Sequence, residues 1–174
     1  MIANIATLDR DSVVHRIAEL EHELFASGAW SEQAVRQELD APARTYLVDI
    51  DDTDQTTIRG YAGFWYDSED AELMTIAVDP AYQRQGIAAG LLNALIEQAR
   101  LQGAGRMLLE VRVDNDPALN LYQRFGFIRM GIRRRYYQPE GIDAYTMALE
   151  LKKRVVGFQP STNDAPHDHT KEQA

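Results

Sequence analysis

The spacing of apolar residues along the chain alternates between the two periods that define helices and strands. Some segments place apolar residues every three or four positions, which predicts amphipathic helices, and others gather β-branched and aromatic residues, which predicts strands. The predicted strands cover 2–8, 45–50, 57–66, 73–78, 107–113, 127–133 and 142–151. The predicted helices cover 12–25, 32–39, 88–98 and 116–126. Strands and helices in this order favour a mixed α/β sheet with helices on both of its faces.

Capping residues and turn formers mark the ends of these elements. Asp11 or Ser12 is expected to cap the first helix, and Asp116 followed by Pro117 to open the last. The acidic run DDTDQ separates the second and third strands and predicts a hairpin with a solvated turn. The strand at 107–113 has a mostly apolar centre, which is typical of a strand covered on both faces.

The chain length of 174 residues favours one domain, which we assign to residues 1–155. Residues 156–174 contain turn formers and charges but no residues suited to a core, and we expect them to form a disordered tail. His167 and His169 lie in this tail, where histidines are more often incidental than metal ligands. We therefore predict no metal site.

Composition and charge exclude several classes of protein. The chain has no cysteine, which rules out disulfide frameworks, thiolate metal sites and a cysteine nucleophile. The formal net charge of −9 argues against direct binding of nucleic acid. It favours encounter with basic partners, although acidity that serves only solubility fits equally well. No apolar run approaches the ~20 residues of a membrane span, and the N-terminus lacks the pattern of a signal peptide. We expect a cytoplasmic monomer without a membrane partner.

The stretch from Leu73 to Gln98 predicts a strand, a tight loop and then a helix. The first turn of a helix carries backbone N–H groups without intrahelical partners, and the helix dipole favours negative charge at the same place. Gly86 permits close backbone approach, Ala88 is small where the helix begins, and Arg84 offers a charge. This loop is suited to bind an anion, but an ordinary helix start with polar residues in solvent would have the same spacing.

Two runs of this sequence resemble the GNAT N-acetyltransferases. IAVDPAYQRQGIAAGLL is similar to their acetyl-coenzyme A motif, Q/R-x-x-G-x-G/A, and NDPALNLYQRFGF is similar to their N-x-x-A-x-x-L-Y-x-x-x-G-F segment. The resemblance covers roughly residues 5–151 and implies a GNAT fold: α/β, with a mixed, mostly antiparallel central sheet of about seven strands and helices on both faces. It also implies acetyl-coenzyme A as the cosubstrate. The chain departs from many members at Ala89, where they have Arg or Ser.

The resemblance implies which residues bind the cofactor. The acetyl and pantetheine portion is assigned to Ile76, Ala77 and Val78, and the pyrophosphate to Arg84, Gln85, Gly86, Ile87, Ala88 and Ala89. Asn115 is expected to help hold the cofactor.

Three further segments resemble the RimI family of ribosomal-protein-alanine acetyltransferases. They are WSE after the first helix, LLEVRVDN at 108–115, and IRRRYYQPEGIDAYTMAL at 132–149, where Arg135 replaces a frequent Asn. This resemblance implies that Glu110 is the general base and Tyr122 the general acid. Trp30 and Tyr137 are expected to line the substrate site.

Elementary chemistry is compatible with these roles and leaves alternatives open. Amide formation needs an uncharged amine and a proton for the departing thiolate, which a carboxylate and a phenol can provide. From the residues alone, Glu110 could instead pair with Arg112 on the same strand face, and Tyr122 could be a core residue. Trp30 could likewise be a packing residue. Without a cysteine, direct attack by the amine is favoured over a cysteine-linked acyl-enzyme.

The resulting hypothesis is acetyl transfer from acetyl-coenzyme A to the N-terminal alanine of a basic protein, small-subunit ribosomal protein eighteen. Other GNAT substrates remain as alternatives, namely lysine, polyamine or aminoglycoside amines. A non-catalytic acyl-coenzyme A sensor is a further alternative, although the presence of both Glu110 and Tyr122 argues against it.

Overall fold

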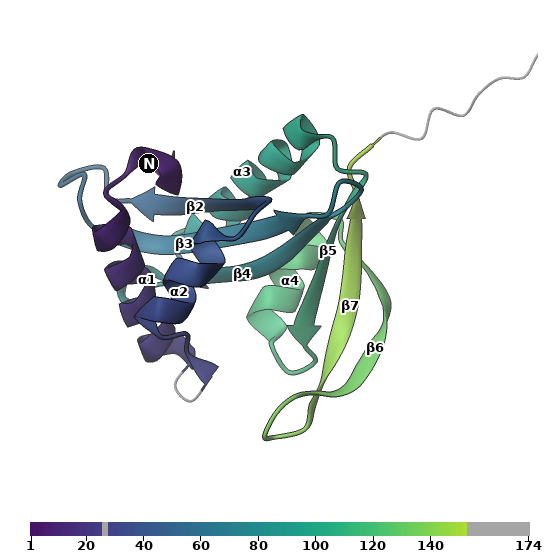
Figure 1. The fold of residues 1–174 in the computed structure, drawn as a ribbon. Coiled ribbons are helices and arrows are strands. Elements are labelled where there is room, and N and C mark those ends of the chain that lie inside the picture. Colours follow the sequence, from purple (N-terminus) through teal and green to yellow (C-terminus); the bar gives the residue numbers. More distant parts are fainter. Residues whose placement is uncertain (26–27, 153–174) are drawn as a thin grey trace, which may run out of the picture.

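A computed structural model describes residues 1–25 and 28–152, which form a seven-stranded sheet with helices on both faces (Figure 1). The strands are β1 Ile2–Asn4, β2 Arg44–Ile50, β3 Ile58–Tyr66, β4 Ala71–Val78, β5 Arg106–Arg112, β6 Ile128–Tyr137 and β7 Ile142–Glu150. The α-helices are α1 Arg10–Phe25, α2 Glu32–Asp40, α3 Ile87–Gln102 and α4 Asp116–Arg124. The strand order is β1-β2-β3-β4-β5-β7-β6, and every neighbouring pair is antiparallel except β4 and β5. The predicted mixed, mostly antiparallel sheet is confirmed. The predicted tail and the domain end at residue 155 lie outside the described residues.

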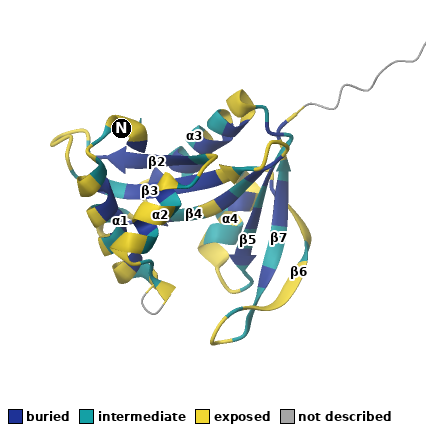
Figure 2. Cartoon of the chain, viewed as in Figure 1, coloured by how far each residue is buried: buried dark blue, intermediate teal, exposed yellow. Residues whose placement is uncertain are grey.

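Two apolar layers hold the helices against the sheet. Leu91, Leu92 and Leu95 of α3 pack with Phe64 and Met107 on one face. On the other face α1 and α2 contribute a second cluster of buried residues: Val13, Val14, Ile17, Leu20, Val35 and Leu39, which pack with Tyr46, Val48 and Tyr61. Figure 2 shows the middle strands buried between these layers, whereas β6 at the sheet edge is largely exposed. The sheet is therefore rigid in its centre, and this rigidity fixes the strand ends that carry the site.

The parallel strands β4 and β5 diverge and open the sheet. They pair only at Ala71 with Met107 and at Glu72 with Leu108, and beyond those pairs the strands separate (Figure 1). A register shift against β3 leaves Met74 as an extra residue in β4. Because such a bulge reverses the alternation of side chains, Leu73 belongs to the α3 layer and Ala77 to the α1 layer. The result is a gap between the carboxyl ends of two neighbouring strands.

Two helix caps differ from the prediction. Asp9, and not Asp11 or Ser12, caps α1: its carboxylate accepts hydrogen bonds from the backbone N–H and the hydroxyl of Ser12. Asn115, and not Asp116, caps α4, because its side-chain oxygen accepts from the N–H of Ala118 at 3.2 Å. In both cases a capping residue precedes the predicted one, because its side chain reaches forward to the N–H three residues on.

Three predicted strands have different boundaries or exposure. The first strand ends at Asn4, where a 3-10 turn over Ile5–Thr7 begins. The run after Arg133 is not a loop but continues β6 to Tyr137, with a register shift and a positive φ of 51° at Arg135. β5 alternates between buried and half-buried residues, so the expectation that both of its faces are covered was wrong. Its polar face borders the gap between β4 and β5.

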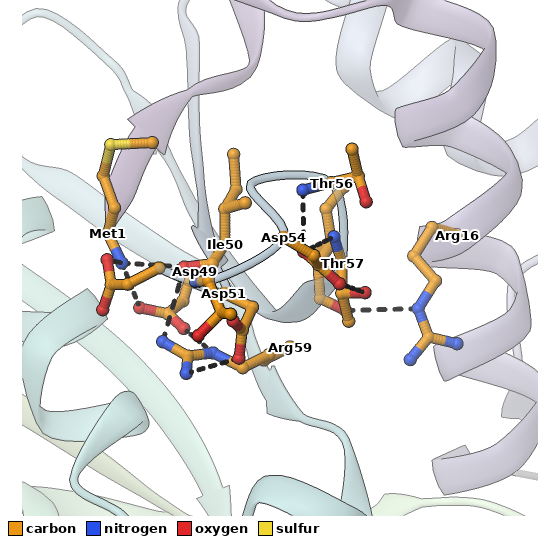
Figure 3. A network of polar contacts seen from close by, with 12 residues as sticks. Met1, Arg16, Asp49, Ile50, Asp51, Asp54, Thr56, Thr57 and Arg59 are labelled. Atoms are coloured by element: carbon orange, nitrogen blue, oxygen red, sulfur yellow. Dashed lines mark hydrogen bonds and ion pairs between the residues drawn. The ribbon is translucent and has the colours of Figure 1, made fainter.

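The acidic turn of the β2–β3 hairpin is satisfied by internal contacts (Figure 3). Arg59 donates to Asp49 at 2.7 Å and to Asp51 at 3.2 Å. Asp54 accepts the backbone N–H groups of Thr56 and Thr57 at 2.9 and 2.8 Å. The predicted hairpin is confirmed, and its carboxylates act as turn formers.

Candidate active site

A cavity of about 760 Å³ lies beyond the carboxyl end of β4. Its walls come from the end of β4, the loop before α3, the first turn of α3, and α4. The residues that line it are Ile76, Val78, Tyr82, Gln83, Arg84, Gly86, Ile87, Ala88, Ala89, Asn115, Pro117, Ala118, Leu121, Tyr122 and Arg124. Most of the residues that the sequence assigned to a cofactor therefore share one cavity.

The first turn of α3 presents backbone donors to this cavity. Gly86 is the N-cap with a φ of +83° and makes no side-chain capping bond. The first helical hydrogen bond runs from the N–H of Gly90 to the carbonyl of Gly86 at 2.9 Å. The N–H groups of Ile87, Ala88 and Ala89 are therefore not used by the helix. An anion at this helix start would accept these donors and interact favourably with the helix dipole.

Two arginines add positive charge to the same cavity. Arg84 precedes α3 in the left-handed region with a φ of 63°, and Arg124 lies at the end of α4. Arg84 was predicted from its place in the loop. Arg124 was missed, because its place in the cavity depends on where the fold puts α4 relative to the loop before α3, and the local sequence carries no signal of that placement.

Hydrogen bonds to buried or half-buried groups hold the loop between β4 and α3 in place. Asp79 is buried, and its carboxylate accepts the N–H of Ala81 at 2.8 Å and the guanidinium of Arg16 at 2.5 Å. The Gln83 amide donates to the carbonyl of Val78 at 3.2 Å. Helix α1 thus helps to fix the loop that presents the α3 donors.

A second cavity of about 400 Å³ meets the first between the diverging strands. Both cavities are lined by Ile76, Asn115, Ala118 and Tyr122. The second cavity extends along β4 and β5 to the end of α1 and the β6–β7 loop; its further lining residues are Phe25, Gly28, Leu73, Met74, Thr75, Glu110, Val111, Arg112, Tyr137, Gln138 and Glu140. The two cavities therefore meet at the gap between β4 and β5.

Glu110 lies in the second cavity and is held by β6. Its side chain is 16% exposed, and it forms an ion pair with Arg133 at 3.0 Å. The hydroxyl of Tyr136 donates to its other oxygen at 3.3 Å. Arg112, the alternative partner considered from the sequence, pairs with Asp114 instead at 3.0 Å. Glu110 therefore faces the cavity with an orientation set by two residues of an adjacent hairpin.

A second carboxylate lies near Glu110 on the same sheet face. Glu72 pairs with Leu108 in the parallel register, and Leu108 stands two positions before Glu110. Burial raises the pKa of Glu72, and the charge of Glu110 raises it further. Arg133 and Arg44 act in the opposite direction on this pKa. Glu72 lines neither cavity, so Glu110 is the carboxylate of this pair that faces the second cavity.

Tyr122 lies at the junction of both cavities and is 5% exposed. Its ring packs at a tilt against Phe127, with the ring centroids 5.6 Å apart. Burial raises the pKa of the Tyr122 phenol, and the nearby Tyr137 raises it further. The phenol is therefore protonated at neutral pH and can act as a proton donor at the junction.

The remaining predicted residues take different positions. Tyr137 lines the second cavity, and the Arg112 guanidinium lies 5.7 Å from the centre of the Tyr137 ring. Burial raises the pKa of the Tyr137 phenol. Ala77 is buried in the α1 layer, and Gln85 lies outside the lining of both cavities. Trp30 packs half-buried against the α1 and α2 cluster and also lies outside both linings.

Comparison with known proteins identifies the fold and the reaction type. The sequence model described as the acetyltransferase (GNAT) family matches residues 14–127, more than half of the chain. The chain belongs to the GNAT acetyltransferase family. It is 44% identical over 142 residues to the N-alpha-acetyltransferase RimI of Mycobacterium tuberculosis, covering 76% of this chain and 83% of the relative. It is 44% identical over 85 residues to the ribosomal protein bS18-alanine N-acetyltransferase of Escherichia coli, covering 48% of this chain and 57% of the relative.

A solved structure extends this GNAT assignment to the whole fold. The crystal structure of the ribosomal-protein-S18-alanine N-acetyltransferase from Escherichia coli superimposes with a TM-score of 0.75 at 29% identity, over 91% of this chain and 99% of that one. The RimI-like resemblance is confirmed, and the chain is an acetyl-coenzyme A-dependent N-acetyltransferase. Within residues 1–25 and 28–152, no helix is long and apolar enough to cross a membrane. Across the same residues, no cluster of three or more potential ligands is arranged to hold a metal.

Proposed function

We propose that this GNAT enzyme acetylates the α-amine of an N-terminal alanine, and that its substrate is small-subunit ribosomal protein eighteen. The observation that carries the proposal is the meeting of two cavities at Tyr122, with Glu110 in the second cavity and the start of α3 in the first. The names of two relatives and of the superimposed structure support the substrate class. We further propose that the reaction takes place in the cytoplasm and that the enzyme acts as a monomer.

The first cavity fits acetyl-coenzyme A. The free N–H groups of Ile87–Ala89, together with Arg84, would bind the pyrophosphate, and Arg124 offers a further cationic contact. Ile76 and Val78 would flank the pantetheine, and Asn115 would hold it from α4. This arrangement brings the thioester to the junction, beside Tyr122.

The chain's own residues carry the proton transfers of the proposed reaction. Glu110 accepts a proton from the substrate ammonium, which leaves a neutral amine to attack the acetyl carbonyl carbon. A backbone N–H at the end of β4 stabilises the negative charge that develops on the carbonyl oxygen. The C–N bond forms as the C–S bond breaks, and Tyr122 gives its proton to the departing thiolate. The second proton that the nitrogen loses after attack returns through solvent to the Tyr122 phenolate, and Glu110 releases its proton to solvent. Both groups line the junction or the adjoining cavity, as direct transfer requires.

Amine chemistry favours an N-terminal substrate for this base. An α-amine has a pKa of ~8 and a lysine amine ~10.4, so near neutral pH the uncharged fraction of the α-amine is about 10²-fold larger. Glu110, which lines the second cavity and pairs with Arg133, therefore has a smaller protonated fraction to deprotonate when the acceptor is an α-amine than when it is a lysine. The second cavity, at about 400 Å³, has room for a short chain end.

Initial rates on a peptide panel test the proposal. The peptides begin with Ala, Ser, Met or Pro and are otherwise identical, and one control has a blocked N-terminus with a free lysine. The alanine peptide is expected to react fastest, and the blocked peptide not at all. Faster reaction of the blocked peptide, of a polyamine or of an aminoglycoside would refute the proposed acceptor. Coenzyme A binding without any transfer would identify a sensor instead.

A further inference from the structure

A buried carboxylate of α1 has no role in the proton transfers described above. Glu21 is 4% exposed and lies among the residues of the α1 layer. One of its oxygens accepts the hydroxyl of Tyr61, and the other accepts the backbone N–H of Trp30 at 3.1 Å. The ion pairs found within residues 1–25 and 28–152 include none to Glu21. Two hydrogen bonds therefore compensate for the burial of this side chain.

One of these hydrogen bonds leads to the β4 wall of the second cavity. Tyr61 lies on β3 and is fully buried. Burial raises the pKa of its phenol, and the charge of Glu21 raises it further. In the sheet Tyr61 pairs with Ala77 of β4, and Ala77 stands two residues after Thr75, which lines the second cavity. Glu21 is thus connected through Tyr61 and its strand pairing to the β4 wall of the cavity.

The other hydrogen bond leads to the α1 wall of the same cavity. Trp30 follows Gly28 by two residues, and Gly28 and Phe25 both line the second cavity. The Trp30 ring packs against the cluster of α1 and α2, so the hydrogen bond from its N–H to Glu21 fixes the backbone at this point. The same carboxylate therefore binds one residue next to the α1 wall and one residue next to the β4 wall of the second cavity.

We propose that Glu21 is a positioning residue for the amine substrate, holding Trp30 and Tyr61 so that the second cavity keeps its shape. This inference rests on the proposed function, because the second cavity must be the acceptor site. Neither Glu21 nor Trp30, Tyr61 or Thr75 lines the first cavity. Loss of Glu21 should therefore weaken acceptor binding and leave acetyl-coenzyme A binding and the chemical step unchanged.

Two variants and a control separate this role from general damage. Glu21→Leu removes both acceptors and should raise the KM for an alanine-ended peptide about tenfold, since a hydrogen bond to a charged group is worth at least that factor. Glu21→Gln keeps an oxygen for the Trp30 N–H and an amide for Tyr61, and its peptide KM should stay within about twofold of wild type. The KM for acetyl-coenzyme A and kcat should change by less than about twofold in both. Glu23→Gln, on the exposed side of the same helix, should change nothing.

Hydrogen exchange gives a readout that needs no substrate. In Glu21→Leu the Trp30 amide should exchange at least about tenfold faster than in wild type, because its acceptor is gone. The role is refuted if that amide keeps its protection, if the peptide KM is unchanged, if both KM values rise together, or if Glu21→Gln behaves like Glu21→Leu. A wild-type enzyme that ignores alanine-ended peptides would refute the proposed function instead, and the Trp30 amide would still decide the role of Glu21.

Discussion

Gly86 offers a direct test of the cofactor site, because replacing it with alanine has two separable effects. At its φ of +83° an L-residue is strained by about 1–2 kcal/mol. An added Cβ would meet no protein atom within 4 Å, so this strain is the whole effect on stability. For a chain of this length the melting temperature should fall by roughly 2–8 °C. The methyl group would enter the first cavity at the proposed pyrophosphate position, and we expect affinity for coenzyme A to fall about tenfold, or ~1.4 kcal/mol.

Gly103→Ala is the matched control at the other end of α3. Gly103 has a φ of +93°, its added Cβ would be 3.7 Å from the Tyr66 hydroxyl, and it lines neither cavity. Thermal unfolding should show a similar loss of stability in both variants. Calorimetric titration with coenzyme A should show weaker binding only in Gly86→Ala. Unchanged affinity in Gly86→Ala, or a parallel loss in both variants, would refute the assignment of this helix start to the pyrophosphate.

Two further predictions concern the catalytic groups and one acidic turn. Glu110→Gln and Tyr122→Phe should each lower kcat by about 10²-fold or more while titrations show unchanged coenzyme A affinity, since each removes a proton-transfer group; rates equal to wild type would remove these roles. The pKa of Asp54 is lowered from 3.8 to about 2, because its carboxylate accepts hydrogen bonds from the hydroxyl and backbone N–H of Thr57 and from the N–H of Thr56. The stability that Asp54 contributes should be complete above pH 3.8 and be lost as the pH falls through about 2. Titration by NMR should follow this carboxyl, and Thr57→Val should raise its pKa; a wild-type value of 3.8 would contradict the turn geometry.

The elements and the position of the glycine loop before α3 could be predicted because their signals are local. Apolar periodicity, a glycine at the start of α3 and the order of strand, loop and helix all lie within short windows of sequence. The structure places Arg84, Gly86 and Ala88 on one cavity wall, as this local pattern indicates. Cap positions were misassigned by one to three residues, because several nearby polar side chains around Asp9 and Asn115 have equivalent propensity.

The shape of the acceptor site could not be predicted because it depends on distant residues. β4 separates from β5 because of the bulge at Met74 and because their pairing stops after Glu72. Neither the bulge nor the end of the pairing has a recognisable signal in the local sequence. The pairing of Glu110 with Arg133 requires the return of β6 beside β7. Phe25 and Gly28 line the cavity, and the hydrogen bond from Trp30 to Glu21 that follows them joins residues nine positions apart. Trp30, assigned to the lining by resemblance, instead packs behind that wall.

The central claim is that the enzyme acetylates an N-terminal α-amine through the cavity that holds Glu110. The most direct measurement uses one peptide with an N-terminal alanine and an internal lysine, incubated with enzyme and acetyl-coenzyme A, and locates the acetyl group by fragmentation mass spectrometry. The account predicts a single acetyl group on the alanine nitrogen, with its formation strongly slowed in Glu110→Gln. Acetylation of the lysine with a free alanine amine, or undiminished transfer by Glu110→Gln, would contradict it.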